Sequence, residues 1–296
     1  MDRSELTSRV IPLMSLSTGS SPLTAPFQQS ETLSATERAA NRFRVHGNAI
    51  VTGGAGDLGL TASRALLEHG LSGLVIFDLL ESQAAADRVA ALAAAFPDAR
   101  ISFRRVDVTD EAAVGAAVEA VARDLGSVDV LLAFAGVASC AHATEVSAQE
   151  WRRALDINAT GSFLCAQAVA RVQSRLGLRG SIVLVASISA HRVNFPQPQA
   201  AYNASKAAVL AAAKSLAAEW ARHGIRVNSI SPGYMDTILN EGDGLKVARD
   251  TWNERNPTGR MGVPEELCGA VVLLASRAAS YMTGADLLID GGQTLF

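Results

Sequence analysis

From Asn48 onward, short apolar runs alternate with longer alanine-rich stretches. The runs are rich in branched residues, which is typical of buried strands. We predict seven strands, at 48–52, 73–78, 101–107, 128–134, 181–187, 225–231 and 286–290. The stretches between them predict helices near 58–69, 82–95, 110–125, 148–175, 200–223 and 264–276.

This alternation predicts the fold class. Strands separated by helices of this length are joined by right-handed crossovers, which produce a parallel sheet. The strands are almost continuously apolar, as expected for a sheet covered on both faces. The sequence therefore predicts an α/β, doubly wound Rossmann fold, with a seven-stranded parallel sheet flanked by helices on both faces.

The first 43 residues differ from the rest of the chain. The segment STGSSPLTAPFQQSETLS is rich in Ser, Thr, Pro and Gln and lacks apolar periodicity, so we expect residues 1–43 to form a flexible tail. Arg3 and Arg9 are accompanied by Asp2 and Glu5, so a mitochondrial transit peptide is the less favoured interpretation. Residues 44–296 are expected to form a single domain.

Composition narrows the function classes. The chain has 296 residues and a net charge of -3, which suits one large soluble domain and gives no basic stripe for nucleic acid. No apolar run reaches the roughly 20 residues of a membrane span. Cys140, Cys165 and Cys268 are widely spaced, which favours reduced thiols in the cytoplasm. The five histidines show no ligand spacing, so no metal site is expected.

The sequence TGGAGDLG follows the first strand and opens a helix, the context of a dinucleotide-binding loop. Gly54, Gly56 and Gly59 spell G-x-G-x-x-G. Read from Thr52, the same letters spell T-G-x-x-x-G-x-G, except that Asp57 replaces the middle glycine. Because Asp is a good N-cap, we expect Asp57 to cap the helix and turn away from the pyrophosphate.

Two acids end the next strands. Asp78 is placed to accept hydrogen bonds from the adenosine ribose, and it would repel a 2′-phosphate, with no Arg or Lys following before Arg88. NAD(H) is therefore favoured and NADP(H) is the alternative; a strand-end Asp that only caps a turn is the simpler interpretation. Asp107, followed by Val108, is expected beside the adenine, with capping of the next helix as the alternative.

Tyr202 and Lys206 are four residues apart at the start of a predicted helix, so their side chains share one face. A nearby ammonium favours the phenolate of a tyrosine whose reference pKa is about 10. The pair could therefore transfer protons near neutral pH, although a half-buried Tyr beside a solvated Lys is common. Ser187 ends a strand at the ligand-binding edge, and Asn158 interrupts a helical stretch.

Together these motifs resemble the classical short-chain dehydrogenase/reductase family over about residues 44–296. The matching pieces are TGGAGDLG, Asp78, Asp107-Val108, AFAG at 133–136, Asn158, Ser187, YNASK at 202–206, SPGYMDT at 231–237, GRMGVPEE and TGADLLIDGG at 283–292.

The resemblance implies a role for each matched residue. Tyr202 would protonate the carbonyl oxygen in reduction and accept the proton in oxidation. Lys206 would lower the pKa of Tyr202 and hold the nicotinamide ribose. Ser187 would hydrogen-bond the substrate oxygen, and Asn158 would hold a water that links Lys206 to solvent. The implied cofactor-binding residues are Thr52, Gly53, Asp57, Leu58, Gly59, Asp78, Asp107, Val108, Gly136, Tyr202, Lys206, Pro232 and Gly233.

This pattern maps Gly53 and Gly59 and leaves Gly54 and Gly56 as flexible turn residues. The chain departs from the family at two further places. The usual Asn-Asn-Ala-Gly motif is Ala-Phe-Ala-Gly here, so only the backbone role of Gly136 carries over. Ser189 would give the common spacing of thirteen to the tyrosine, but we choose Ser187 because it directly follows the strand.

The runs VNFPQPQAAYNASKAA and SPGYMDT resemble the branch that oxidises sugar alcohols and reduces ketoses, which includes mannitol 2-dehydrogenase, arabinitol dehydrogenase and sorbose or xylulose reductases. The loop HRVNFPQPQ would form a polar wall suited to hydroxyl groups. A reductase of a less polar ketone is the alternative, and a non-catalytic nucleotide sensor is disfavoured by the presence of Tyr202 and Lys206. The segment at about 234–256 matches the mobile substrate lid. The family also implies a homo-oligomer, a tetramer or dimer, formed through the helices near 148–175 and 200–223.

Overall fold

The computed structural model describes residues 8, 10–28, 32–79 and 82–296. Its described strands form one parallel sheet in the order β3-β2-β1-β4-β5-β6-β7, which confirms the predicted doubly wound fold. The direction of the order reverses between β1 and β4, and such switch points bind ligands at the carboxyl ends of the strands. The strands are β1 (Asn48–Thr52), β2 (Gly73–Asp78), β3 (Arg100–Arg105), β4 (Val130–Ala133), β5 (Ser181–Val185), β6 (Arg226–Pro232) and β7 (Asp286–Ile289).

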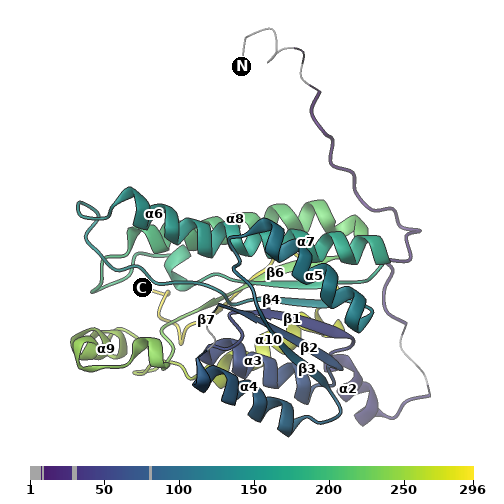
Figure 1. The fold of residues 1–296 in the computed structure, drawn as a ribbon, viewed down its shortest axis with the longest axis horizontal. Coiled ribbons are helices and arrows are strands. Elements are labelled where there is room, and N and C mark those ends of the chain that lie inside the picture. The colour runs from purple at the N-terminus through teal and green to yellow at the C-terminus, as the bar shows by residue number, and fades with distance from the viewer. Residues whose placement is uncertain (1–7, 9, 29–31, 80–81) are drawn as a thin grey trace.

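Helices cover both faces of the sheet (Figure 1). One face carries α3 (Asp57–Glu68), α4 (Gln83–Ala95) and α10 (Cys268–Ala275), and the other carries α5 (Glu111–Leu125), α7 (Gly161–Leu176) and α8 (Ala200–Trp220). Successive side chains of a strand point to opposite faces. In β1, Ile50 therefore packs with α5, α7 and α8, while Ala49 and Val51 pack with α3, α4 and α10.

The long helical stretch predicted at 148–175 is divided into three parts. Helix α6 (Ala148–Leu155) and α7 are joined by a π-helical turn, Asp156–Thr160. Asn158 lies inside this turn. Turns of this kind are rare and occur frequently at functional sites, because the extra residue redirects a side chain.

The region expected to be a flexible tail contains a helix that the sequence analysis did not predict, α2 (Ala35–Phe43). Ser34 and Glu37 form a reciprocal capping box at its start, which satisfies two free N–H groups. The helix is held against the body by Arg277 Nε, which donates to Asn41 O at 2.9 Å. The structure thus places a helix in the last part of the segment predicted as a tail, while its flexibility and the domain boundary at residue 43 stay predictions.

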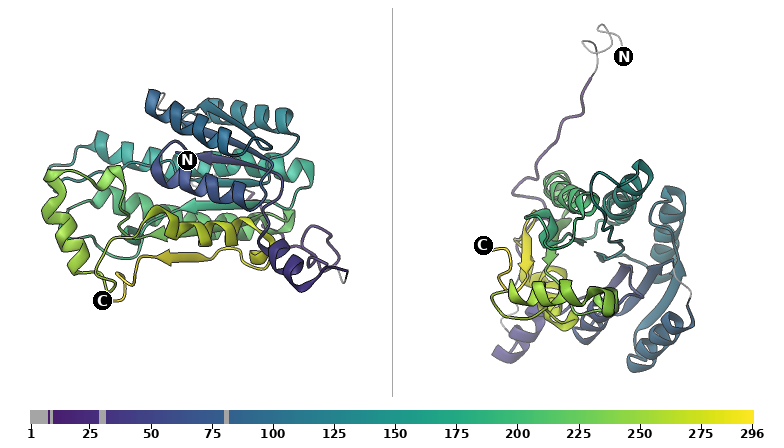
Figure 2. Two further views of the ribbon diagram at one scale, coloured as in Figure 1. Left: turned by 90° about the horizontal axis from the view of Figure 1, so that it is seen from below. Right: turned by 90° about the vertical axis from the view of Figure 1, so that its left-hand side faces the viewer.

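The two ends of the sheet have different neighbours. Figure 2 (left) shows α9 (Lys246–Glu254) at the carboxyl edge of the sheet and α2 at the opposite, amino edge. Helix α9 lies within the segment predicted as a lid and was not predicted from the sequence. Within the described part of the chain, no helix is long and apolar enough to span a membrane.

Candidate active site

The loop after β1 approaches its neighbours too closely for side chains at two glycines. Gly53 has φ +63, and a Cβ there would lie 2.7 Å from Ala135 N. A Cβ on Gly59 would lie 2.4 Å from Gly53 O. These are the glycines that the T-G-x-x-x-G-x-G pattern requires. Thr52 Oγ1 accepts from Ala135 N at 3.2 Å and joins the loop to the residues after β4.

Gly54 and Gly56 were predicted to be glycines because the turn needs a flexible backbone, and this reason is wrong. Only Gly53 in this loop has a positive φ. Gly54 is required by close packing, because a Cβ there would lie 2.9 Å from Val51 O and 3.0 Å from the side chain of Ile76.

Asp57 is not the predicted helix cap. The N-cap of α3 is Gly56, with no side-chain capping bond, and Asp57 is the first helical residue, followed by the half-buried Leu58. Among the described residues, the Asp57 carboxylate accepts from none of the N–H groups at the start of α3. Asp57 Oδ2 instead accepts from Ile238 N at 3.0 Å, and Oδ1 lies 3.0 Å from Arg88 Nη1. The acid therefore connects the glycine loop to the segment predicted as the lid.

Asp78 lies against the glycine loop, as its predicted role requires. Its Oδ2 accepts from Ala55 N at 3.1 Å, and its Oδ1 accepts from Leu79 N at 2.8 Å. The expectation that no cation lies nearby is wrong, because Arg105 is the residue paired with Asp78 across β2 and β3. Sequence proximity could not reveal it, since Arg105 is brought there by strand pairing. Arg88 is engaged by Asp57.

Asp107 organises the turn after β3. Its Oδ1 accepts from Thr109 N at 2.9 Å and from Thr109 Oγ1 at 2.7 Å, and these bonds lower the pKa of the Asp107 carboxyl. The cap of α5 is Asp110, which accepts from Ala113 N, so Asp107 does not cap that helix. Val108 packs on Gly161, where a Cβ would lie 2.7 Å from Val108 Cγ2.

Gly136, Asn158 and Lys206 are brought together behind the glycine loop. A Cβ on Gly136 would lie 3.1 Å from Asn158 Oδ1 and 3.5 Å from Lys206 Nζ. The fully buried Asn158 accepts from Val137 N at 2.8 Å and donates to Val137 O at 3.0 Å and Ser205 Oγ at 2.9 Å. The amide therefore fixes the chain after β4 to α8. Its predicted role as a water ligand stays a prediction.

Tyr202 and Lys206 share one face of α8, as predicted from their spacing. Lys206 Nζ lies 5.7 Å from the ring centre of Tyr202 and donates to Val185 O at 2.8 Å. Burial lowers the pKa of Lys206 to about 8. Burial also raises the pKa of Tyr202, and the hydrogen bond with Ser187 acts in the opposite direction. The lowered tyrosine pKa expected from the resemblance is thus not produced by the surrounding side chains.

Two serines compete for the position next to Tyr202. Ser187 is the one that hydrogen-bonds with Tyr202. Ser189 Oγ instead accepts from Ser187 Oγ at 3.0 Å and from Gln199 Nε2 at 3.1 Å. Ser187 therefore acts on the pKa of Tyr202, while Ser189 is bonded to Ser187 and Gln199; the choice of Ser187 as the substrate serine stays a prediction.

A group of polar and aromatic side chains, which we call the polar collar, surrounds the hydroxyl of Tyr234. Asn194 Nδ2 and Gln197 Nε2 each donate to Tyr234 Oη at 2.8 Å. The Tyr234 ring stacks on Trp252 at 4.1 Å, and Trp252 Nε1 donates to Gln197 Oε1 at 3.1 Å. The collar acts electrostatically on the candidate tyrosine, because Tyr234 is one of the groups that raise the pKa of Tyr202.

Asn194 and Gln197 belong to the loop HRVNFPQPQ that was predicted as a polar wall, whereas the contacts of Tyr234 and Trp252 with it were not predicted. In the sequence, Tyr234 and Trp252 are single aromatic residues in polar segments. A pattern of this kind does not predict that two rings 18 residues apart stack on each other. His191, expected in the same wall, instead lies 2.9 Å from Asp286 Oδ2 and 3.2 Å from Ser231 Oγ. It therefore joins the loop to β6 and β7.

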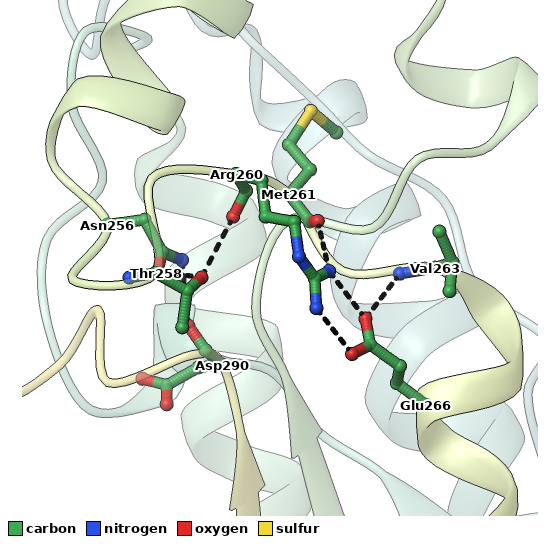
Figure 3. A network of polar contacts seen from close by, with 7 residues as sticks. All are labelled: Asn256, Thr258, Arg260, Met261, Val263, Glu266 and Asp290. Atoms are coloured by element: carbon green, nitrogen blue, oxygen red, sulfur yellow. Dashed lines mark hydrogen bonds and ion pairs between the residues drawn. The ribbon is translucent and has the colours of Figure 1, made fainter.

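The segment predicted as the lid is attached firmly at both ends. At its start, Pro232 ends β6, and a Cβ on Gly233 would lie 2.8 Å from Asp290 Cα. At its end, Asn256 Nδ2 donates to Asp290 O at 2.9 Å. Beyond it, Figure 3 shows the guanidinium of Arg260 facing the carboxylate of Glu266, 2.7 Å away, which lowers the pKa of Glu266 to about 2. Any movement must therefore occur between these anchors.

Comparisons with known proteins agree with this geometry. The family model described as enoyl-(acyl carrier protein) reductase matches residues 54–294. The chain is 40% identical to galactitol 2-dehydrogenase of Rhizobium johnstonii, covering 86% of this chain and 97% of that protein. It is 34% identical to a probable NADP-dependent mannitol dehydrogenase of Yarrowia lipolytica, covering 93% and 96%.

A solved structure is similar over most of the molecule. The NADPH-dependent 3-quinuclidinone reductase of Rhodotorula rubra superposes with a TM-score of 0.81 at 34% identity, covering 92% of this chain and 100% of that one. The relatives therefore include proteins named for polyols and one named for a less polar ketone.

Proposed function

The chain belongs to the short-chain dehydrogenase/reductase family and is an NAD(P)-dependent oxidoreductase acting on CH–OH groups; from this premise we propose that it interconverts a polyol and the corresponding ketose. The reaction moves a hydride and a proton between a secondary alcohol and a nicotinamide. The names of the polyol dehydrogenases among its relatives support this substrate class.

The polar collar is the observation that carries the proposal. Tyr234 Oη accepts from two amides, so its own hydrogen is left to donate elsewhere. Asn194 Oδ1 is buried and has no hydrogen-bond partner among the described residues. A substrate with several hydroxyls could supply both missing partners, whereas a ketone without hydroxyls would leave them unpaired. Leaving such buried groups unpaired costs about 1–3 kcal/mol each.

The residues around Tyr202 divide the chemistry among them. The raised pKa of Tyr202 keeps its hydroxyl protonated, as an acid for carbonyl reduction must be. Ser187, which hydrogen-bonds with Tyr202, would donate to the same substrate oxygen. With a pKa of about 8, Lys206 is mostly charged at neutral pH and would stabilise the phenolate left after proton transfer. In oxidation the same phenolate would take the alcohol proton.

The cofactor site fits a dinucleotide. Gly53 and Gly59 leave no room for side chains where a pyrophosphate must approach the start of α3, and Asp78 is held at the loop by Ala55 N. When bound, the nicotinamide supplies or accepts the hydride. We propose a preference for NAD(H), supported by the negative charge of Asp78. The relatives that are named as NADP-dependent and the position of Arg105 argue for NADP(H).

A reductase of a less polar ketone is the second candidate, favoured by the similarity to the 3-quinuclidinone reductase and by the stacked rings of Tyr234 and Trp252. The test compares galactitol, mannitol and arabinitol with an apolar cyclic ketone, using NAD(H) and NADP(H) separately. We expect turnover of a polyol with NAD(H). Turnover of the apolar ketone alone contradicts the polyol proposal, and a clear preference for NADPH contradicts the argument from Asp78.

Substitutions in the polar collar test whether its side chains recognise the polyol. Tyr234→Phe should lower kcat/KM for the polyol about 10- to 100-fold, because one buried polar partner is lost. Val193→Ala is the matched control, since Val193 lies in the same loop and is 81% exposed. Equal effects of the two substitutions would contradict a role of the collar in recognition.

Three further parts of the proposal concern the lid, the assembly and the compartment. Residues 234–256 would close over the substrate between their two anchors. The chain would form a homo-oligomer through α7 and α8, supported by the half-exposed Phe163 on α7 and measurable by light scattering. Cytoplasmic localisation is supported by three free cysteines, Cys140, Cys165 and Cys268.

A further inference from the structure

A second cavity lies at the amino edge of the sheet, away from Tyr202. Its volume is about 650 Å³, within the range of small-molecule sites. Its wall includes Ser181, the first residue of β5, whereas Ser187 lies just beyond the other end of that strand. Six residues of extended chain separate the two serines by roughly 20 Å. The cavity is therefore distinct from the candidate active site, and we call it the amino-edge pocket.

The amino-edge pocket is assembled from distant parts of the chain. The starts of β4, β5 and β6 form its floor, and the residues after α10 form one side. The segment before α2 forms another side, through Leu23, Thr24 and Phe27. Arg179 donates to Ala25 O and lies over the Phe27 ring, 4.0 Å from its centre. The N-terminal segment thus closes a cavity that the core sheet leaves open.

The described lining of the amino-edge pocket is strongly cationic. It contains four arginines and one histidine but only one carboxylate, that of Asp129. That carboxylate is already used by the fold, because Asp129 Oδ2 accepts from Asn48 N at 2.8 Å and Ser127 Oγ at 2.5 Å. The cationic residues are Arg44, Arg179, Arg226, Arg277 and His46.

None of these arginines forms an ion pair with any described residue. Arg226 Nη2 donates to Leu274 O at 2.8 Å and to Ser276 O at 3.2 Å, and Arg277 Nε donates to Asn41 O. These partners are neutral carbonyls. Arg226 Nη1 is buried and has no hydrogen-bond partner in the described part of the chain. A buried guanidinium usually has a carboxylate or other anion as its partner, and the described residues supply none for Arg226.

The titration behaviour agrees with an excess of positive charge. Burial, together with the smaller effect of the charge of Arg179, lowers the pKa of Arg226 to about 10. Burial also lowers the pKa of His46, followed by repulsion from Arg44 and Arg277, with Asp129 acting in the opposite direction. The charged forms of Arg226 and His46 are therefore disfavoured by burial and by neighbouring positive charge, and an anion among them would relieve this repulsion.

We propose that the amino-edge pocket binds a small organic anion that carries a phosphate or carboxylate group, with Arg226 Nη1, Arg44 and Arg179 as its donors. The guanidinium fork matches both oxyanions, often with two parallel hydrogen bonds. The ring of Phe27 offers an apolar surface for the rest of the ligand. This site does not depend on the proposed substrate.

Calorimetric titration tests the site directly. The full chain, saturated with NADH so that the glycine loop is occupied, is titrated with inorganic phosphate and with citrate. We expect saturable binding of one equivalent of at least one of them. Preference for phosphate would identify the ligand as a phosphate ester, and preference for citrate as a polycarboxylate. Absence of saturable binding of both anions would overturn the proposal.

Variants locate the binding. Arg44→Gln should weaken it about tenfold, the loss of roughly one charge-assisted hydrogen bond. The Arg44 side chain makes no hydrogen bond with the described residues, so its loss should leave the fold intact. Arg179→Gln should have a similar effect but also releases the N-terminal segment. Arg171→Gln, an exposed arginine of α7 outside the pocket, is the control. Unchanged affinity in both pocket variants, or an equal loss in the control, would overturn the assignment.

Discussion

Two cations lie at opposite edges of the same sheet, the buried Lys206 and the half-buried Arg226, and their chemistry differs. Lys206, at the carboxyl edge, donates to Val185 O, and burial lowers its pKa to about 8. Arg226, at the amino edge, donates to Leu274 O and Ser276 O, and burial lowers its pKa to about 10. Burial therefore brings the pKa of the Lys206 ammonium close to neutral pH but leaves the Arg226 guanidinium charged. One edge suits proton transfer, and the other suits permanent attraction of an anion.

The largest expected effect is a loss of kcat that occurs on substitution at the carboxyl edge of the sheet but not at the amino edge. Tyr202→Phe removes the transferable proton and should lower kcat by about 10²- to 10⁴-fold while leaving NADH binding nearly unchanged. Arg44→Gln, at the amino edge, should keep kcat within about twofold because it lies far from the reacting atoms. Steady-state kinetics and NADH fluorescence titration measure both. Substantial turnover by Tyr202→Phe would refute the proposed acid.

A pH series tests the buried ammonium. The folded pKa of Lys206, about 8, is below the ordinary lysine value of 10.5, so the cost of burying the charge is fully present below pH 8 and disappears as pH rises to 10.5. The free energy of unfolding of the wild type, relative to Lys206→Met, should therefore rise by up to about 3 kcal/mol over this window.

Denaturant unfolding of both proteins at pH 7, 8, 9 and 10 provides the measurement. The comparison between them cancels distant groups that titrate in this range, including Arg226, but not Tyr202, whose ring centre lies 5.7 Å from Lys206 Nζ; both proteins therefore also carry Tyr202→Phe. If the difference in free energy of unfolding between the two proteins does not vary with pH, Lys206 is not buried as a cation. The proposed difference in chemistry between Lys206 and Arg226 would then be contradicted.

The smallest effect concerns how the carboxyl edge is closed. Asp57→Ala removes the acceptor for Ile238 N and should raise the KM for substrate about 2- to 10-fold, the value of one hydrogen bond. Asp250→Asn is the control, because Asp250 lies in the same segment but pairs only with the exposed Lys246 among the described residues. If the KM is the same in Asp57→Ala as in the wild type, the bond does not position the lid.

Local patterns predicted the parts of the site that depend on a few neighbouring residues. The alternation of apolar runs and helices predicts the doubly wound sheet, since both faces of each central strand must be buried. The glycines of TGGAGDLG predict a close backbone approach, which the structure shows at Gly53 and Gly59. The spacing of Tyr202 and Lys206 predicts a shared helix face, because a helix repeats about every 3.6 residues.

Long-range partners could not be predicted in this way. Asp57 was expected to cap its own helix, but its partner Ile238 is 181 residues away. Strand pairing brings Arg105 to Asp78, and lid packing brings Trp252 to Tyr234. The roles of these residues depend on contacts with segments that are distant in the sequence, so the local pattern around each residue could not predict them.

The sequence by itself therefore determined the sheet, the cofactor loop and the Tyr202–Lys206 pair, because hydrophobic period and backbone sterics act over short distances. The tertiary structure alone decided what surrounds them: the polar collar at one edge and the amino-edge pocket at the other. The reason is physical, since burial, charge repulsion and unpaired donors arise between segments that the linear chain keeps apart.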